Sequence, residues 1–417
     1  MTSSFQIKEH IIECQHIREY PRALANSQDD VLHLAVKQYT PLDNLEPQDG
    51  DVTIIGAHAN GFPKELYEPL WEDLHAQSKK HGFRIRSIWI SDVAHQGTSG
   101  VLNENLLGDD PSWMDGSRDL LHMINHFRMP TPLVGMGHSL GGAQLVNLSL
   151  IHPRLLSTII LMDPVIQNHA SAPTGPSPAQ ASAFRRDLWP SREEAITAFS
   201  KSKFYSTWDR RVFEKWCEFG IRPVPSSIYP NAEKGSMTLT TTKHQECFTF
   251  MRPSWDGLSP DGNTITNRSL VPDLNLQQPV RYPLYRPEPP TIMGRLPELR
   301  PSAFYIFGEL SNMSLPAVRK QKMDLTGSGL GGSGGAKEGK VKEVVLKGVG
   351  HLVAMEAAGL CAEAAAEWLG REMKRVERER AAYREWTKKS LAEKQTLSEE
   401  WKRRIGGEPV RVKKSKI

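Results

Sequence analysis

A serine flanked by glycines near the middle of the chain has the spacing that nucleophilic catalysis requires. It lies in Gly137-His138-Ser139-Leu140-Gly141, between the apolar, strand-like run 131–136 and the helix-like run 142–150. A strand, a sharp GxSxG turn and a helix form a nucleophile elbow, whose glycines keep side chains away from the strained serine. The pentapeptide alone also occurs in ordinary turns, but its flanks favour Ser139 as a nucleophile.

A nucleophilic serine needs a general base, and one histidine is placed to supply it. His351 follows the strand-like run 344–346 and a glycine turn, and apolar residues typical of a helix start come after it. Of the 14 histidines, only His351 has this placement downstream of Ser139. We therefore expect His351 to be the base; the alternative is a histidine that caps a helix.

Two carboxylates compete for the role of the acid that orients the histidine. Asp163 ends the apolar run 156–162, and Glu309 follows the strand-like run 302–308, where many hydrolases with alternating strands and helices carry their acid. Position alone favours Asp163 over Glu309. The alternative for Asp163 is a helix cap or turn residue beside Pro164, and both carboxylates could simply be polar strand ends.

The oxyanion hole is expected from the loop after an early strand and from the amide that follows the nucleophile. Residues 51–57 are that strand, and His58-Ala-Asn-Gly-Phe-Pro63 is that loop. We predict the backbone amides of Asn60 and Leu140 as the two donors. His58 is expected to order the loop rather than to act as a second base.

The elements that must position these groups alternate between strands and helices. Eight strands are predicted, at residues 6–14, 31–39, 54–58, 83–91, 133–136, 157–162, 303–307 and 342–346. The first two read as an antiparallel start, and helical stretches such as 67–81 and 116–127 separate the others. This alternation predicts an α/β fold with a mostly parallel eight-stranded sheet and helices on both faces.

Residues 166–295 interrupt the alternation and predict a cap or lid inserted after the sixth strand. The core would then comprise 1–165 and 296–370, and the charged residues 371–417 would form a helical extension. Aromatic residues of the cap are interpreted as cap core, with a substrate slot as the alternative: Trp189, Phe204, Trp208 and Trp216. The Gly-rich run 327–335 is predicted to be a flexible loop and not a phosphate cradle.

Composition excludes several classes of function. Lys and Arg number 52 against 48 Asp and Glu, which gives a net charge of +4 and no general footprint for nucleic acid. The four cysteines lack paired spacing, so we expect neither disulfides nor a metal site, and the proposed chemistry needs no cofactor. No secretory signal and no membrane span is expected, which favours a soluble intracellular protein.

The chain ends in Ser415-Lys416-Ile417, a close variant of the Ser-Lys-Leu peroxisomal address. A receptor groove can recognise a small residue, a cation, a bulky aliphatic residue and the free carboxylate together. The tripeptide therefore predicts a peroxisomal import receptor as partner and the peroxisomal matrix as location. The sequence leaves open whether the protein forms a homodimer.

The segment from His58 to Trp71, the Gly-His-Ser-Leu-Gly-Gly elbow and the final tripeptide resemble the fungal peroxisomal α/β-hydrolases. That group includes the yeast peroxisomal lipase, toxin-biosynthesis hydrolases and the acyl-CoA hydrolase of mycophenolic acid biosynthesis. The resemblance covers roughly residues 1–370, except for the Gly-rich loop, and does not extend to the sequence of the C-terminal tail.

The resemblance implies an α/β-hydrolase fold with the triad Ser139, Asp163 and His351, and thus favours Asp163 over Glu309. It also implies a serine hydrolase that releases a free acid from an acyl-CoA thioester or an ester, in the biosynthesis of a secondary metabolite or toxin. The main alternative is a carboxyl-ester or triacylglycerol lipase. An acyltransferase and a non-catalytic binding protein are further alternatives.

Overall fold

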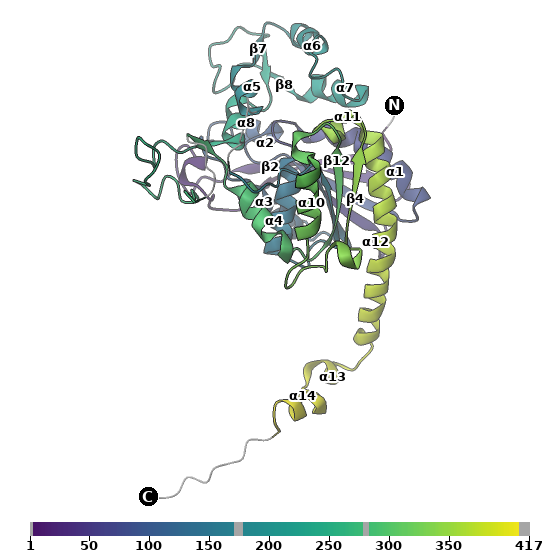
Figure 1. The fold of residues 1–417 in the computed structure, drawn as a ribbon. Coiled ribbons are helices and arrows are strands. Elements are labelled where there is room, and N and C mark those ends of the chain that lie inside the picture. Colours follow the sequence, from purple (N-terminus) through teal and green to yellow (C-terminus); the bar gives the residue numbers. More distant parts are fainter. Residues whose placement is uncertain (1–2, 171–177, 278–282, 408–417) are drawn as a thin grey trace, which may run out of the picture. The chain divides into compact units, whose positions relative to one another are not determined.

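An eight-stranded sheet forms the centre of the fold (Figure 1). The computed structural model describes residues 3–170, 178–277 and 283–407. The strands lie in the order β1-β2-β4-β3-β5-β6-β12-β13. Their bounds are β1 (Phe5–Glu13), β2 (His33–Pro41), β3 (Val52–Ala57), β4 (Ile85–Ser91), β5 (Leu133–His138), β6 (Thr158–Met162), β12 (Ser302–Gly308) and β13 (Val341–Leu346).

The pairing of the strands is mostly parallel. β2 pairs antiparallel with both β1 and β4, and every other neighbouring pair is parallel. All residues of β3, β5, β6 and β12 are buried, as expected for strands covered by helices on both faces. The prediction of a mostly parallel eight-stranded sheet is confirmed, and each predicted strand overlaps an observed one.

Helices cover both faces of this sheet. Figure 1 shows α1 and α12 on one side, and α3 and α4 on the other. α4 packs against α3 and β5, and its Leu145, Val146 and Leu148 belong to the main hydrophobic core. On the opposite face, Trp368 of α12 stacks on Phe304 of β12. The helices of the core are α1 (Glu68–Lys80), α2 (Gly97–Leu102), α3 (Trp113–His126), α4 (Leu140–Ile151), α10 (Pro316–Leu325), α11 (Val353–Glu356) and the part of α12 (Ala358–Thr387) up to residue 370.

The segment between β6 and β12 carries the inserted elements. Its helices are α5 (Pro178–Phe184), α6 (Arg192–Ser200), α7 (Arg210–Phe219), α8 (Lys243–Phe250) and α9 (Glu288–Arg295). Its two small antiparallel sheets comprise β7 (Leu188–Trp189), β9 (Met237–Leu239) and β8 (Ile221–Pro223), and β10 (Arg252–Pro253) with β11 (Leu284–Tyr285). The sequence did not predict these sheets, because strands of two or three residues show no alternation. α9 lies within the range predicted for the cap, yet its Ile292 and Met293 belong to the main core.

Aromatic side chains form the interior of the insertion. Trp189, Trp208 and Trp216 are buried and contact other rings there, whereas Phe204 is 53% exposed. Phe62, from the loop after β3, packs edge-on against Trp208 and Trp216. The three tryptophans therefore pack as cap core, and this core rests directly on the loop expected to form the oxyanion hole.

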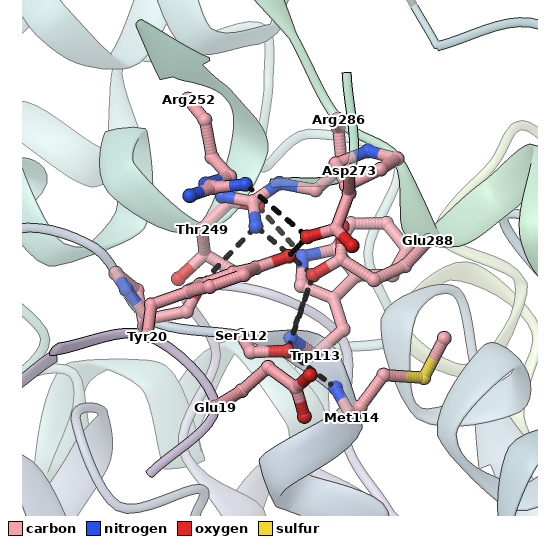
Figure 2. Close-up of polar contacts among 12 residues, drawn as sticks. Glu19, Tyr20, Ser112, Trp113, Met114, Thr249, Arg252, Asp273, Arg286 and Glu288 are labelled. Carbon is pink, nitrogen blue, oxygen red and sulfur yellow. Dashed lines mark hydrogen bonds and ion pairs between the residues drawn. The ribbon is translucent and has the colours of Figure 1, made fainter. Parts of the chain in front are cut away.

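A buried cluster of charged groups attaches the second half of the insertion to the core (Figure 2). Arg252 of β10 lies 3.6 Å from the centre of the Tyr20 ring and donates two hydrogen bonds to Asp110. Arg286 binds Glu288, whose carboxylate accepts a hydrogen bond from the Trp113 amide. Because these buried charges are paired, their separation would leave uncompensated charge in a low dielectric, which resists detachment of this part of the insertion.

The Gly-rich run 327–335 differs from the flexible loop that the sequence predicts. The amides of Gly327, Gly329 and Ser333 donate to the carbonyls of Leu296, Pro297 and Leu299, respectively. A Cβ on Gly332 would lie 2.4 Å from the Pro297 carbonyl oxygen, so the glycine permits a close backbone approach. The run is thus an ordered loop fastened by its backbone.

Residues 371–417 form a second compact unit, separate from the unit of residues 1–370. Its described part contains α13 (Leu391–Gln395), which begins with a capping box between Ser390 and Glu393, and α14 (Glu399–Arg404). Its helices carry exposed ion pairs between residues three or four positions apart, such as Lys402 with Glu399 and Arg404 with Glu400. Ser415, Lys416 and Ile417 lie outside the described residues. No helix in the described ranges is long and apolar enough to cross a membrane.

Candidate active site

Ser139 occupies a strained turn between β5 and α4. Its φ of 54° and ψ of −113° lie outside the regions that non-glycine residues favour. The Ser139 amide donates to the Met162 carbonyl, and the Ser139 carbonyl accepts from the Val165 amide. A Cβ on Gly137 would lie 2.6 Å from the Gly141 carbonyl carbon, so the turn closes only with glycine at this position. The backbone thus has the shape of a nucleophile elbow, which presents the serine hydroxyl at the edge of the sheet.

His351 joins the other two predicted residues of the triad. Its Nε2 lies 2.9 Å from Ser139 Oγ, and its Nδ1 lies 2.5 Å from Asp163 Oδ2. The imidazole comes from the loop between β13 and α11, and the other two groups follow β5 and β6. The structure therefore brings Ser139, His351 and Asp163 together in the geometry of a hydroxyl, a base and an orienting carboxylate.

Asp163 is fully buried and bound on both carboxylate oxygens. Ser311 Oγ donates to Oδ2 at 2.5 Å, and Ser314 Oγ donates to Oδ1. Burial opposes ionisation of this carboxyl, but hydrogen bonds and charge from His351, with hydrogen bonds from the two serines, outweigh it and lower its pKa below the ordinary value. The carboxylate is therefore held in the charged form that can stabilise an imidazolium.

Glu309 does not contact the imidazole. Its Oε2 accepts a hydrogen bond of 2.8 Å from the amide of Gly348, three residues before His351. The turn after β12 instead supplies Ser311 and Ser314, which were not among the predicted site residues. A signal was present, because both hydroxyls follow the strand at whose end the alternative acid was sought.

Among the described residues, the two amides predicted as oxyanion donors, those of Asn60 and Leu140, have no hydrogen-bond acceptor. Around Asn60, hydrogen bonds engage the amides of Ala59, Gly61 and Phe62, but among the described residues none engages the amide of Asn60 itself. Leu140 is the first residue of α4, where helix amides have no acceptor within the helix. His58 binds the Ala59 carbonyl and the Val93 amide, which fits the predicted loop-ordering role.

A chain of hydrogen bonds connects the oxyanion loop to the histidine. Tyr67 Oη accepts from the Ala59 amide and lies 3.0 Å from His138 Nδ1, and His138 Nε2 lies 3.0 Å from the carbonyl oxygen of His351. A carbonyl only accepts, so His138 Nε2 carries the proton and Nδ1 accepts from the tyrosine. Burial lowers the pKa of His138 to about 3, which keeps the ring neutral. This chain was not predicted, although His138 lies within the elbow.

The sheet and the site together define a hydrolase of the α/β class. The family model described as the alpha/beta hydrolase family matches residues 54–364, and the chain belongs to this family. It is 41% identical over 410 residues to the type I acyl-CoA thioesterase mpaH' of Penicillium brevicompactum, which covers 92% of this chain and 91% of that protein. The chain is also 28% identical over 244 residues to the abhydrolase domain-containing protein AKT2 of Alternaria alternata. This match covers 58% of this chain and 85% of that protein. The structure of the peroxisomal α/β-hydrolase Lpx1 of Saccharomyces cerevisiae has the same fold, with a TM-score of 0.67 and 17% identity over 97% of this chain and 96% of that one.

Proposed function

We propose that this protein hydrolyses an acyl-CoA thioester to the free acid and coenzyme A, with Ser139 as nucleophile. The hydrolytic part of the proposal is supported by the contacts of His351 with Ser139 and Asp163. The thioester is chosen on one observation, the 41% identity to a type I acyl-CoA thioesterase over 92% of the chain.

Acylation begins when Ser139 Oγ attacks the thioester carbonyl carbon and His351 Nε2 takes the hydroxyl proton. The resulting oxyanion accepts hydrogen bonds from the amides of Asn60 and Leu140, each worth about 3–4 kcal/mol where such donors have been removed. The intermediate collapses by breaking the carbon–sulfur bond, and His351 returns its proton to the departing thiolate. Asp163 holds the imidazole in the required tautomer and stabilises its charged form.

Deacylation repeats these steps with water. His351 takes a proton from a water molecule that attacks the acyl-serine ester, and the oxyanion again lies between the two amides. When the ester bond breaks, the same proton passes to Ser139 Oγ and the free acid leaves.

The alternative, a lipase acting on glycerides or other carboxyl esters, would use the same residues. Purified protein should be assayed with acyl-CoA, glyceride and simple ester substrates of matched chain length. We expect kcat/KM for the best acyl-CoA to exceed that for the matched glyceride by about 100-fold or more, a difference of about 3 kcal/mol in transition-state stabilisation. Faster turnover of the glyceride would replace the thioesterase proposal with the lipase one.

We further propose that the protein is imported into the peroxisomal matrix. The support is the terminal Ser415-Lys416-Ile417. A fluorescent protein fused before residue 1 should be punctate and overlap a peroxisomal marker in fungal cells, and deletion of these three residues should leave it in the cytosol. Unchanged puncta after the deletion would show that the tripeptide is not the address.

A further inference from the structure

One buried carboxamide lies between the oxyanion loop and the cap. Gln96 follows β4 and is fully buried. Its Oε1 accepts a hydrogen bond of 2.7 Å from the Gly61 amide, and its Nε2 donates to Asn60 Oδ1 at 2.6 Å and to Thr249 Oγ1 at 3.0 Å. Both donors and the acceptor of this side chain are therefore used, two of them on the loop and one on α8.

The side chain of Asn60 is held from two directions. Gln96 donates a hydrogen bond to Asn60 Oδ1. Asn60 Nδ2 in turn donates at 3.1 Å to the carbonyl of Glu246, a residue of α8. The backbone amide of Asn60, the proposed oxyanion donor, therefore belongs to a residue fixed between the core and the cap. A Cβ on Gly61 would lie 2.8 Å from the Glu246 carboxyl carbon, so α8 also packs closely on the loop.

α8 is itself anchored to the core. Thr249 Oγ1, fully buried, lies 2.8 Å from His95 Nε2, and the Thr249 carbonyl accepts from Trp113 Nε1 at 2.7 Å. Trp113 and Thr249 belong to the cluster in Figure 2, where Arg286 also binds the carbonyl of Phe248. Because the end of α8 is fixed in this way, the hydroxyl of Thr249 offers Gln96 a stationary partner.

We propose that Gln96 is a positioning residue that holds the Asn60 amide in the oxyanion hole and couples it to helix α8 of the cap. The proposal rests on the hydrolytic function proposed above. Oxyanion donors act only within about 2.7–3.1 Å of the developing charge. Loss of their placement therefore reduces the stabilisation of the transition state more than it reduces the affinity for the substrate. Gln96 itself does not touch the substrate.

The test compares Gln96→Ala with Asn103→Ala. Asn103 is also a fully buried carboxamide with three hydrogen bonds, but its partners are backbone groups of His33 and Ala94, which are not residues of the oxyanion loop. Both variants should lose thermal stability. We expect only Gln96→Ala to lower kcat for the best acyl-CoA, by about 10- to 100-fold, with KM within about threefold of the wild-type value.

Two inhibitors distinguish a displaced oxyanion hole from general damage. A trifluoromethyl ketone analogue of that acyl-CoA forms an oxyanion with Ser139, whereas a thioether analogue has no carbonyl at this position. Gln96→Ala should lower the affinity for the ketone by about the same factor as it lowers kcat, and it should leave the affinity for the thioether unchanged. Equal losses for both inhibitors, or equal kcat losses in the Gln96 and Asn103 variants, would overturn the positioning role.

Thr249→Val provides the same test from the cap side if Gln96→Ala does not fold. Its matched control is Thr326→Val, because both hydroxyls are fully buried and donate to the carbonyl four residues earlier. Thr249→Val should lower kcat more than its control does, and equal values would contradict the coupling to α8. If Ser139→Ala were as active as the wild type, the hydrolytic proposal itself would fail; Ser139-dependent turnover that is insensitive to Gln96 would refute only the coupling.

Discussion

Replacement of Ser139 by alanine is expected to lower kcat for acyl-CoA hydrolysis by about 10⁴- to 10⁶-fold, as loss of the nucleophile does in serine hydrolases. The physical reason is that Ser139 Oγ, 2.9 Å from His351 Nε2, is the hydroxyl from which this base takes the proton in the proposed reaction. Turnover is measured with a thiol reagent that detects released coenzyme A, on protein freed of trace contaminants.

The control for this substitution is Ser149→Ala in α4, the helix that follows Ser139. Ser149 is also buried, but its hydroxyl donates to the Leu145 carbonyl of its own helix. This variant should keep kcat near the wild-type value, and thermal unfolding should show both variants folded. Activity of Ser139→Ala within about tenfold of the wild type would eliminate Ser139 as the nucleophile.

Asp163→Asn is expected to lower kcat by about 10⁴-fold, whereas Glu309→Gln should change it by less than about tenfold. An asparagine can present its amide group to His351 Nδ1 and thereby favour the wrong tautomer, and it cannot stabilise the imidazolium by charge. Glu309 accepts a hydrogen bond from the Gly348 amide, and the side-chain oxygen of a glutamine can still accept this bond. Steady-state kcat of the two single variants, and of the double variant that carries both substitutions, decides whether Asp163 or Glu309 is the acid.

The double variant matters because a second carboxylate can replace the first. If Glu309 takes over when Asp163 is changed, Asp163→Asn will lose little activity and the double variant will lose much more. A large loss in Glu309→Gln alone would reverse the assignment of the acid. The stability of each variant should be measured in parallel, since Asp163 is buried and binds Ser311 and Ser314.

Local pattern was sufficient to predict the sheet and the elbow. β3, β5, β6 and β12 are buried along their whole length and mostly apolar because helices cover both of their faces, and such runs stand out between polar turns. The elbow was also recognisable, because the strain at Ser139 requires small neighbours within a few residues.

The choice between the two acids could not be made from the residues alone. β6 and β12 are adjacent and parallel, so Asp163 and Glu309 leave the same edge of the sheet from neighbouring strands. Only the path of the turn after β12 shows that Glu309 faces Gly348 while two serines face Asp163. Position alone favoured Asp163 without deciding the choice, and the resemblance to the fungal hydrolases favoured it further.

Long-range contacts account for the other features that were missed. Gln96 is unremarkable in a polar stretch of sequence, and its role depends on α8, about 150 residues later along the chain, reaching the oxyanion loop. The Gly-rich run 327–335 has the composition of a flexible linker, but its partners at Leu296 and Leu299 fix it. In both cases the partners are distant along the chain, and local pattern does not predict which residues become neighbours.

The most direct test of the central claim is the mass of the protein after reaction with a fluorophosphonate, followed by peptide mapping. We expect one adduct per chain, located on Ser139, absent in Ser139→Ala and formed more slowly in His351→Ala. A catalytically active protein that carries no adduct, or carries it on another residue, would contradict the assignment of this serine, this histidine and the mechanism built on them.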